Sequence, residues 1–345
     1  MEQGRVVVLA HLFNCLAGGM EVWLQYLITL CPEFQWRIWV QDGHVESLMH
    51  TQLARQAQIF GGSEWEVAAR GSDVFITPGH PNIERFHGTR ILVAHGSASF
   101  TSELMARYAN CAEVLVAVSS LAALTFPGTE RHRVQMIRNG VDPVRVRSYT
   151  PREVTRHAWG VPADSLIIGF VGRIAPDKRP EWTARAAKAV GAIAVFVGAA
   201  VEEDTRRRIL AEDASTLFLG ERMDIGDIYA ALDCVLMGSR FEGFGFTLAE
   251  SLMAGVPLIA TSVGVLQELT PKYGSLHVRL SEHADVYQLG AAVRLALSDT
   301  YRMNVRRAGE VALHELSVQR TADEWRRMLL SLWSDKRRNN GAIEQ

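Results

Sequence analysis

The stretch RFEGFGFTLAE at residues 240–250 decides the fold, because it contains the passage from a buried strand to a helix. An apolar run at residues 234–237 precedes it and is typical of a buried parallel strand. Two glycines then loosen the backbone, and Thr247 with Glu250 matches the pattern of a capping box, which predicts a helix start. The predicted helix runs to Gly255, a residue that suits a helix end.

The start of this predicted helix combines backbone N–H groups with two carboxylates. The N-terminal N–H groups of a helix and the positive end of its dipole form a place where phosphate binds. Glu242 lies in the loop before the helix, and Glu250 lies in its first turn. A simpler interpretation stays open, in which Glu250 only caps the helix with Thr247 and Glu242 is a solvated loop charge.

The rest of the chain alternates short apolar runs with helical stretches, which predicts parallel, doubly wound sheets. The alternation occurs twice, before and after a strongly charged stretch at residues 143–156 that we interpret as a linker. A long last helix is expected at residues 317–338, where large apolar residues recur at helical spacing. The expected strands are residues 6–9, 36–40, 74–77, 91–94, 114–118 and 134–137 in the first half, and 166–171, 192–197, 216–219, 234–237 and 258–260 in the second.

The bulk composition describes a globular protein with room for two domains. The chain has 345 residues, of which 48% are hydrophobic and 21% charged, and its formal net charge is -2. These values exclude a disordered chain and give no sign of a nucleic-acid partner. No stretch reaches the roughly 18 apolar residues of a membrane span, and the N-terminus lacks a signal-peptide pattern. We therefore expect a cytoplasmic protein, with peripheral membrane attachment left open.

Residues 242–245 read EGFG, and Glu250 follows after four further residues. The segment AGVP comes next, at residues 254–257. This pattern resembles the donor-site signature of retaining glycosyltransferases with the GT-B fold. It is most similar to their family four (glycosyl transferases group 1), which carries a Glu-(x)7-Glu motif. The resemblance covers nearly the whole chain.

The resemblance implies an α/β architecture of two Rossmann-like domains facing a cleft. In this family the last helix crosses back onto the first domain. We therefore expect an acceptor-side domain of residues 1–150 together with a C-terminal segment at about 318–345. A donor domain of residues 151–317 is expected to bind the nucleotide sugar.

Two cations follow the first strand of the second half. Arg173 and Lys178 come at the carboxyl end of a parallel strand, where such sheets bind ligands, and they could neutralise a departing diphosphate. The alternative is a pair of surface cations near Asp177. The resemblance implies that both bind the nucleotide's diphosphate. One departure from the family is Arg179, where a glycine is common, and we expect more local positive charge there.

The same resemblance assigns roles around the glycine loop. Glu250 would hold the ribose hydroxyls, because a carboxylate accepts from two vicinal OH groups, and Glu242 would lie near the donor sugar. The base is expected against residues 220–223. The loop at residues 261–268 looks like a later glycine loop of the family, but Val265 replaces its second glycine and we assign it no role. Backbone N–H contacts to phosphate or sugar oxygens are implied for Phe244, Gly245, Phe246 and Thr247.

The first half offers fewer candidates. Gly18 and Gly19 open a helix; either they make a simple turn, or, as in the family, they approach the donor phosphate and acceptor. His95 follows the strand at 91–94 and is either structural or, as the family's placement implies, a polar residue of the active site. Asn139 matches a family motif at the hinge and would contact the cleft.

The predicted function is transfer of a sugar, with retention, from a nucleotide-diphosphate donor to an acceptor hydroxyl. UDP is the expected nucleotide by family base rate. No Asp-x-Asp motif and no His/Cys cluster with metal spacing occurs, so we expect no metal site and no cofactor. The catalytic candidates are His95, Arg173, Lys178 and Glu242. The alternatives are another GT-B enzyme, such as an inverting transferase or a sugar-nucleotide epimerase, or an inactive subunit that binds a sugar nucleotide.

The acceptor is the least determined part of this prediction. Acceptor contacts are expected on variable loops of the first domain. A small-molecule or saccharide acceptor is preferred, a lipid acceptor stays open, and the oligomeric state is unknown. The four cysteines have no ligand-like spacing and are expected to be buried free thiols.

Overall fold

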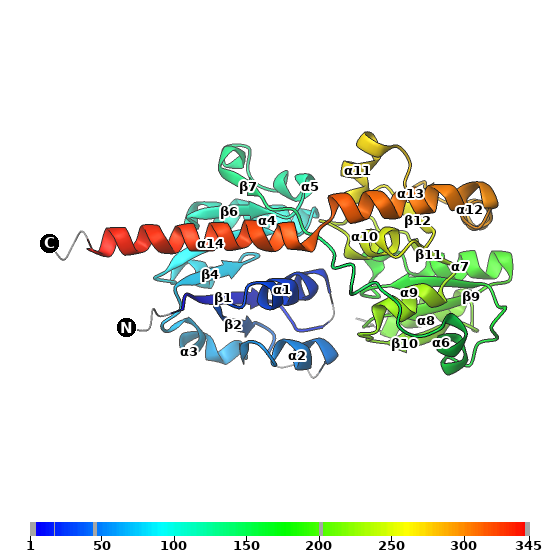
Figure 1. Ribbon diagram of the computed structural model, residues 1–345, viewed down its shortest axis with the longest axis horizontal. Helices are drawn as coiled ribbons and strands as arrows, with labels where there is room; N and C mark the ends of the chain where they lie inside the picture. The colour runs from blue at the N-terminus through cyan, green and yellow to red at the C-terminus, as the bar shows by residue number, and fades with distance from the viewer. Residues whose placement is uncertain (1–4, 17, 44–46, 200–202, 342–345) are drawn as a thin grey trace. The chain divides into compact units, whose positions relative to one another are not determined.

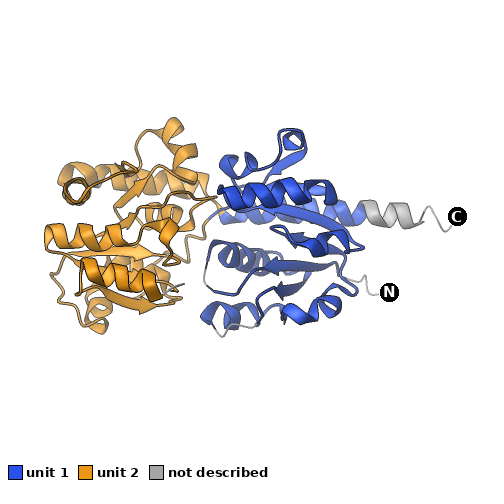
Figure 2. Cartoon of the chain, turned by 180° about the vertical axis from the view of Figure 1, so that it is seen from behind, with its two compact units in different colours: residues 1–140, 318–345 blue, residues 141–317 orange. Residues whose placement is uncertain are grey.

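The computed structural model describes residues 5–16, 18–43, 47–199 and 203–341. The chain divides into two compact units (Figure 2). Unit 1 consists of Met1–Gly140 and Val318–Gln345, and unit 2 is Val141–Ser317. Each unit has its own parallel sheet, so the predicted architecture of two doubly wound α/β domains is confirmed.

Unit 1 is built, within its described residues, on a seven-stranded sheet in the order β3-β2-β1-β4-β5-β6-β7 (Figure 1). All neighbouring strands are parallel. The order reverses between β1 and β4, which is the switch point of a doubly wound sheet. The strands are β1 (Val7–Leu12), β2 (Gln35–Val40), β3 (Gln58–Phe60), β4 (Val74–Thr77), β5 (Thr89–Ala94), β6 (Val114–Ala117) and β7 (Val134–Met136). The helices are α1 (Gly19–Leu30), α2 (Leu48–Leu53), α3 (Trp65–Ala69), α4 (Ser99–Tyr108), α5 (Ser120–Ala123) and α14 (Val318–Gly341), with 3-10 turns at Gly62–Glu64, Pro81–Glu84, Ala109–Cys111 and Arg131–Arg133.

Unit 2 has, within its described residues, a six-stranded parallel sheet in the order β10-β9-β8-β11-β12-β13. Its order reverses between β8 and β11, and both strands are buried along their whole length. Continuous apolar runs suit this position because helices cover both faces of such a sheet. The strands are β8 (Ile167–Val171), β9 (Ile193–Val197), β10 (Leu217–Gly220), β11 (Cys234–Met237), β12 (Leu258–Thr261) and β13 (Val278–Leu280). The helices are α6 (Arg152–Ala158), α7 (Glu181–Val190), α8 (Glu203–Glu212), α9 (Ile225–Ala231), α10 (Phe246–Met253), α11 (Val265–Tyr273), α12 (Val286–Ala296) and α13 (Asp299–Glu315), with a 3-10 turn η5 at Pro176–Lys178.

The boundary between the units lies earlier than the predicted boundary after residue 150. Val141 N donates to Leu316 O at 2.8 Å, which ties the start of the connecting segment to the end of unit 2. Residues 148–150 also hydrogen-bond to Asp227 on α9. The segment from Val141 onward therefore packs as part of unit 2.

The C-terminal helix α14 belongs to unit 1 and packs against α1 (Figure 1). Arg326 donates to Glu33 Oε1 at 2.6 Å, and Thr321 Oγ1 donates to Arg138 O at 2.7 Å. Trp325 is fully buried, as expected for the apolar face of this helix. Residues 342–345 of the predicted C-terminal segment lie outside the described residues.

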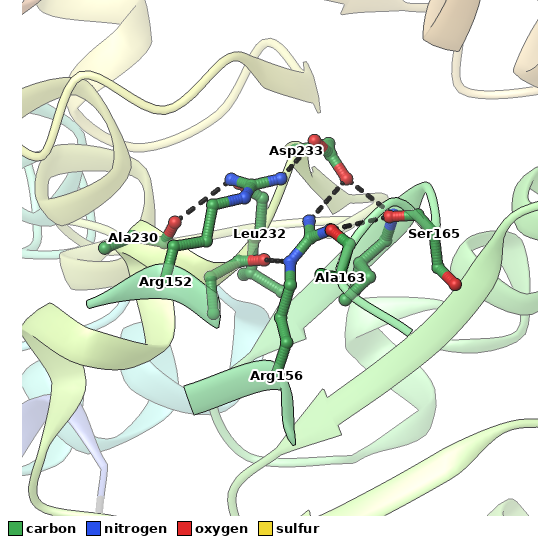
Figure 3. Close-up of polar contacts among 9 residues, drawn as sticks. Arg152, Arg156, Ala163, Ser165, Ala230, Leu232 and Asp233 are labelled. Atoms are coloured by element: carbon green, nitrogen blue, oxygen red, sulfur yellow. Dashed lines mark hydrogen bonds and ion pairs between the residues drawn. The ribbon is translucent and has the colours of Figure 1, made fainter. Parts of the chain in front are cut away.

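A buried ion pair fastens α6 to the sheet of unit 2 (Figure 3). Arg156, with 2% of its side chain exposed, donates to Asp233 Oδ2 at 2.8 Å. Arg152 pairs with the other oxygen of Asp233, and Ile167 N donates to Asp233 Oδ2 at 2.7 Å. The remaining donors of Arg156 reach the backbone carbonyls of Ala163, Ser165 and Ala231. Because each of these donors meets an acceptor, this arginine can be buried between α6 and the starts of β8 and β11.

No helix in the described part of the chain is long and apolar enough to cross a membrane. All four cysteines are free, as predicted; Cys15, Cys31 and Cys234 are buried, and Cys111 is partly exposed.

Candidate functional site

The loop between β11 and α10, residues 238–245, is called the site loop here. The helix that follows it starts differently from the prediction. Helix α10 begins at Phe246, its N-cap is Gly245, and no side chain caps it. The predicted capping box of Thr247 and Glu250 is therefore wrong. Thr247 Oγ1 instead donates to Val171 O at 2.8 Å, at the end of β8. The threonine thus joins the first turn of α10 to the neighbouring strand.

Gly245 enables this helix start through its backbone conformation. Its φ of +84° is strained for other residues, and an added Cβ would lie 2.7 Å from Leu248 Cδ1. The first backbone hydrogen bond from α10 to its cap runs from Ala249 N to Gly245 O at 3.1 Å. The N-terminus of α10 is therefore formed next to the carboxyl ends of β8 and β11, where a helix dipole favours an anion.

Lys178 and Glu242 meet at this edge of the sheet. Lys178 Nζ lies 2.7 Å from Glu242 Oε1, and Ser239 Oγ donates to the same oxygen at 2.9 Å. The two charged side chains are only 15% and 14% exposed. The strands that precede them, β8 and β11, are direct neighbours. Glu242 is therefore held by two partners, which overturns its interpretation as a solvated loop charge.

Arg173 lies on the same edge but is more accessible. Arg173 Nη2 lies 3.7 Å from Asp177 Oδ2, and Lys178 Nζ lies 3.8 Å from the same oxygen. The side chain of Arg173 is 45% exposed. Both cations therefore lie near Asp177, as the alternative prediction had it, and both are also at the switch point where ligands bind such sheets.

Arg179 occupies a backbone conformation that favours glycine. Its φ is +46°, and it is the one non-glycine residue with positive φ among those described. Its guanidinium lies over the ring of Trp182 at 4.8 Å and donates to Gly238 O at 3.1 Å. The stacking and the hydrogen bond offset the backbone strain, and they turn this side chain toward α7.

Glu250 is the most buried carboxylate of the site, with 5% of its side chain exposed. Arg145 Nε donates to its Oε1 at 2.9 Å, and Tyr229 OH donates to its Oε2 at 2.9 Å. Burial and the nearby Glu250 charge raise the pKa of Tyr229 well above its usual value, so the tyrosine stays a neutral donor. Arg145 and Tyr229 were not predicted as site residues, since neither lies in a motif.

The loop at residues 261–268, to which the sequence analysis assigned no role, packs directly on the site loop. Val265 N donates to Phe244 O at 2.8 Å. Gly264 has a φ of +55°, and an added Cβ would lie 2.4 Å from Phe244 O and 2.9 Å from Glu242 Cβ. The only sequence feature that could have indicated this packing is Gly264, which directly precedes the first residue of α11.

The remaining predicted residues lie in unit 1. Gly18 is the N-cap of α1, and Gly19 is its first residue. His95 follows β5 and packs edge-on against Trp23, with ring centroids 4.5 Å apart; burial lowers its pKa to about 3. The ring is therefore neutral near pH 7. Asn139 is buried, and its Oδ1 has no hydrogen-bond partner within the described residues.

Among the described residues, no group of three or more His, Cys, Asp or Glu side chains is arranged to hold a metal ion. The acidic and basic side chains of the site are instead paired with one another.

Comparison with known proteins links unit 2 to a family. Residues 165–299 match the family model of glycosyl transferases group 1. The chain is similar to D-inositol 3-phosphate glycosyltransferase of Mycolicibacterium smegmatis, with 28% identity over 43% of this chain and 37% of that protein. It is also similar to the lipopolysaccharide core biosynthesis mannosyltransferase LpsB of Rhizobium meliloti, with 30% identity over 39% of this chain and 42% of that protein. The matches thus span less than half of these relatives.

Solved structures extend the likeness to the fold of nearly the whole chain. HepE of Anabaena, in complex with UDP and glucose, has a TM-score of 0.80 at 19% identity and covers 95% of this chain and 100% of its own. WaaG, a glycosyltransferase of lipopolysaccharide biosynthesis, has a TM-score of 0.69 at 16% identity over 92% of this chain and 98% of its own. Residues 165–299 are therefore similar to the glycosyl transferases group 1 family, and the chain as a whole has the two-domain GT-B fold.

Proposed function

We propose that this protein is a retaining glycosyltransferase that moves a sugar from a nucleotide-diphosphate donor to an acceptor hydroxyl without a metal ion. The observation that carries the proposal is the grouping of Arg173, Lys178 and Glu242 beside the N-terminus of α10. UDP is the favoured nucleotide, because the similar HepE was solved with UDP and with UDP-glucose.

The cationic side of this grouping suits a diphosphate. The exposed Arg173 can reach a ligand and form paired hydrogen bonds with phosphate oxygens. Lys178 is held in place by Glu242 at 2.7 Å. The N-terminus of α10 adds the positive end of its dipole, with backbone N–H groups that follow Phe244 and Gly245. Three sources of positive potential thus point to one anionic group.

The same groups suggest how the reaction would proceed. The acceptor oxygen forms a bond to the anomeric carbon as the bond from that carbon to the diphosphate breaks. The acceptor hydroxyl attacks on the face of the leaving group, and its proton passes to a donor phosphate oxygen. Arg173 and Lys178 stabilise the negative charge that grows on the departing diphosphate. Glu242 keeps Lys178 oriented and offers a carboxylate near the donor sugar.

The acceptor is proposed to be a small molecule or a saccharide. The names of the relatives indicate an inositol phosphate acceptor for one and a lipopolysaccharide core for the other. His95 would serve as a neutral hydrogen-bonding group for a substrate, because its low pKa excludes the imidazolium form near neutral pH. Gly18, Gly19 and Asn139 are proposed as further binding positions of unit 1.

The test begins with calorimetric titration of UDP, GDP, ADP and TDP in EDTA and in Mg²⁺. We expect UDP to bind best, with equal affinity in both buffers. The Lys178→Met variant should bind UDP more weakly than wild type. Turnover of UDP-sugars is then followed by NMR of the product's anomeric proton. An inverted anomer would refute retention and favour an inverting transferase. Nucleotide binding without turnover of any donor would favour an inactive binding subunit, and no binding at all would refute the proposal.

A further inference from the structure

The Glu250 carboxylate is held from both sides by residues that the donor-site motif does not contain. Arg145 Nε donates to Oε1 and Tyr229 OH donates to Oε2, each at 2.9 Å. A carboxylate has about four acceptor positions, two on each oxygen. Within the described residues, these two bonds use one position on each oxygen. A carboxylate can in addition accept from the two vicinal hydroxyls of a ribose ring.

Helix α9 positions both partners of Glu250. Tyr229 lies on α9 itself. Arg145 lies on the connecting segment that begins at Val141. Asp227 of α9 binds this segment through hydrogen bonds. The Asp227 carboxylate accepts from Ser148 Oγ at 2.9 Å, from Tyr149 N at 2.6 Å, from Thr150 N at 2.9 Å and from Thr150 Oγ1 at 2.6 Å. Four hydrogen bonds to one carboxylate keep this segment in place.

The backbone of α9 also packs closely against the connecting segment. A Cβ added to Gly226 would lie 2.0 Å from Arg147 O, so a residue with a side chain would push the segment away. Arg147 is two positions after Arg145 in the sequence. The position of the Arg145 guanidinium therefore depends on α9, and so does the Tyr229 hydroxyl.

We propose that Arg145 is a positioning residue that orients Glu250 toward the 2′- and 3′-hydroxyls of the donor ribose and thereby sets the preference for ribonucleotides over deoxyribonucleotides. The inference rests on the function proposed above, because it needs a nucleotide in the site. Arg145 itself does not touch the ligand. It fixes the rotamer of Glu250, and the carboxylate makes the contact.

The experiment measures the Kd of UDP and of 2′-deoxy-UDP by calorimetry. Wild type is compared with Arg145→Met, Arg145→Lys and Tyr229→Phe. The matched control is Arg147→Met, which removes an exposed arginine of the same segment that stacks on Tyr149 at 5.7 Å. Each ligand-free variant is first checked by circular dichroism for a native-like unfolding transition.

We expect wild type to bind UDP at least about tenfold more tightly than 2′-deoxy-UDP, since one hydrogen bond to a carboxylate is lost. Arg145→Met should reduce this preference to about threefold or less, and Arg145→Lys should retain most of it. Tyr229→Phe keeps the packing, removes only the hydroxyl and should reduce the preference as well. Arg147→Met should behave as wild type. In a Glu250→Ala background, Arg145→Met should change the UDP affinity by less than about twofold.

The inference is overturned if Arg145→Met weakens the binding of UDP and of 2′-deoxy-UDP by the same factor, because loss of a purely structural ion pair would affect both ligands equally. It is equally overturned if Arg145→Met and Tyr229→Phe leave the preference unchanged. Failure of wild type to bind any nucleoside diphosphate would overturn the proposed function together with this inference. The behaviour of wild type therefore separates the two failures.

Discussion

Removal of the Asp233 carboxylate should destabilise unit 2 far more than removal of a surface carboxylate. In Asp233→Ala the buried Arg156, which is 2% exposed, loses its ion-pair partner. Breaking such a pair costs about 3–5 kcal/mol, and the amide of Ile167 also loses its acceptor. The half-exposed Arg152 adds about 1 kcal/mol at most. Because Asp233 is itself partly exposed, we expect a total loss near the lower end, about 3–4 kcal/mol.

The matched control is Asp204→Ala on α8. Asp204 also pairs with two arginines, Arg207 and Arg208, but its side chain is 63% exposed. Exposed pairs of this kind contribute about 0.5 kcal/mol or less. The two variants thus remove the same group with the same number of arginine partners, and they differ in burial and in the hydrogen bond from Ile167.

The assay is urea unfolding combined with hydrogen–deuterium exchange. Exchange in peptides that span β8 and β11 reports on unit 2, while peptides from β1 and β5 provide an internal reference in unit 1. We expect faster exchange in β8 and β11 of Asp233→Ala, with unit 1 peptides unchanged. If Asp233→Ala changes the unfolding free energy by no more than Asp204→Ala, the buried pair does not stabilise α6 against the sheet and the reasoning fails.

Three further predictions concern the site and its support. Lys178→Met should lower kcat about 100-fold or more through loss of leaving-group stabilisation, whereas Lys188→Met on the exposed side of α7 should not; equal turnover in both variants would contradict the role of Lys178. Burial alone would raise the pKa of Asp227, but the hydrogen bonds from residues 148–150 outweigh it and lower the pKa to about 2, below its ordinary value of 3.8. Its stabilising contribution is therefore present above about pH 4 and lost as the pH falls toward 2, and urea midpoints of Asp227→Asn should depend less on pH in this range than those of wild type. Gly264→Ala should lower the melting temperature and weaken UDP binding, because the added Cβ would lie too close to Phe244 O. Gly255 has a similar φ and open space around it, so Gly255→Ala should cost only the backbone strain of about 1 kcal/mol. Equal melting temperatures for the two glycine variants would show that the contact with Phe244 does not matter.

The strands were predictable where the apolar runs are long and central. The runs at residues 74–77 and 234–237 have the same bounds as β4 and β11, and the other predicted strands differ from the observed ones only at their ends. Strands β3 and β13 were not predicted. Each has three residues and lies at the edge of its sheet, so neither needs the continuous apolar run that marks a strand buried on both faces.

The site was predictable in its residue types but less so in its contacts. Arg173, Lys178 and Glu242 come together because their strands are neighbours and their carboxyl ends share one edge. Glu250 lies on the predicted helix but in its second turn rather than its first, and its partners were not foreseen. The capping-box prediction failed because Gly245, in a left-handed conformation, starts the helix earlier and leaves Thr247 to bond with β8.

The sequence by itself determined the alternation of strands and helices, the glycine loop and the charged residues that follow β8 and β11. These features depend on local patterns, since the period of apolar residues and the conformational freedom of glycine act over a few neighbouring positions. Only the tertiary structure decided that Arg145 and Tyr229 hold Glu250 and that Gly264 packs on Phe244. These contacts join segments far apart in the chain. A buried charge takes whichever partner the packing brings within hydrogen-bond distance, and no local pattern records which partner that is.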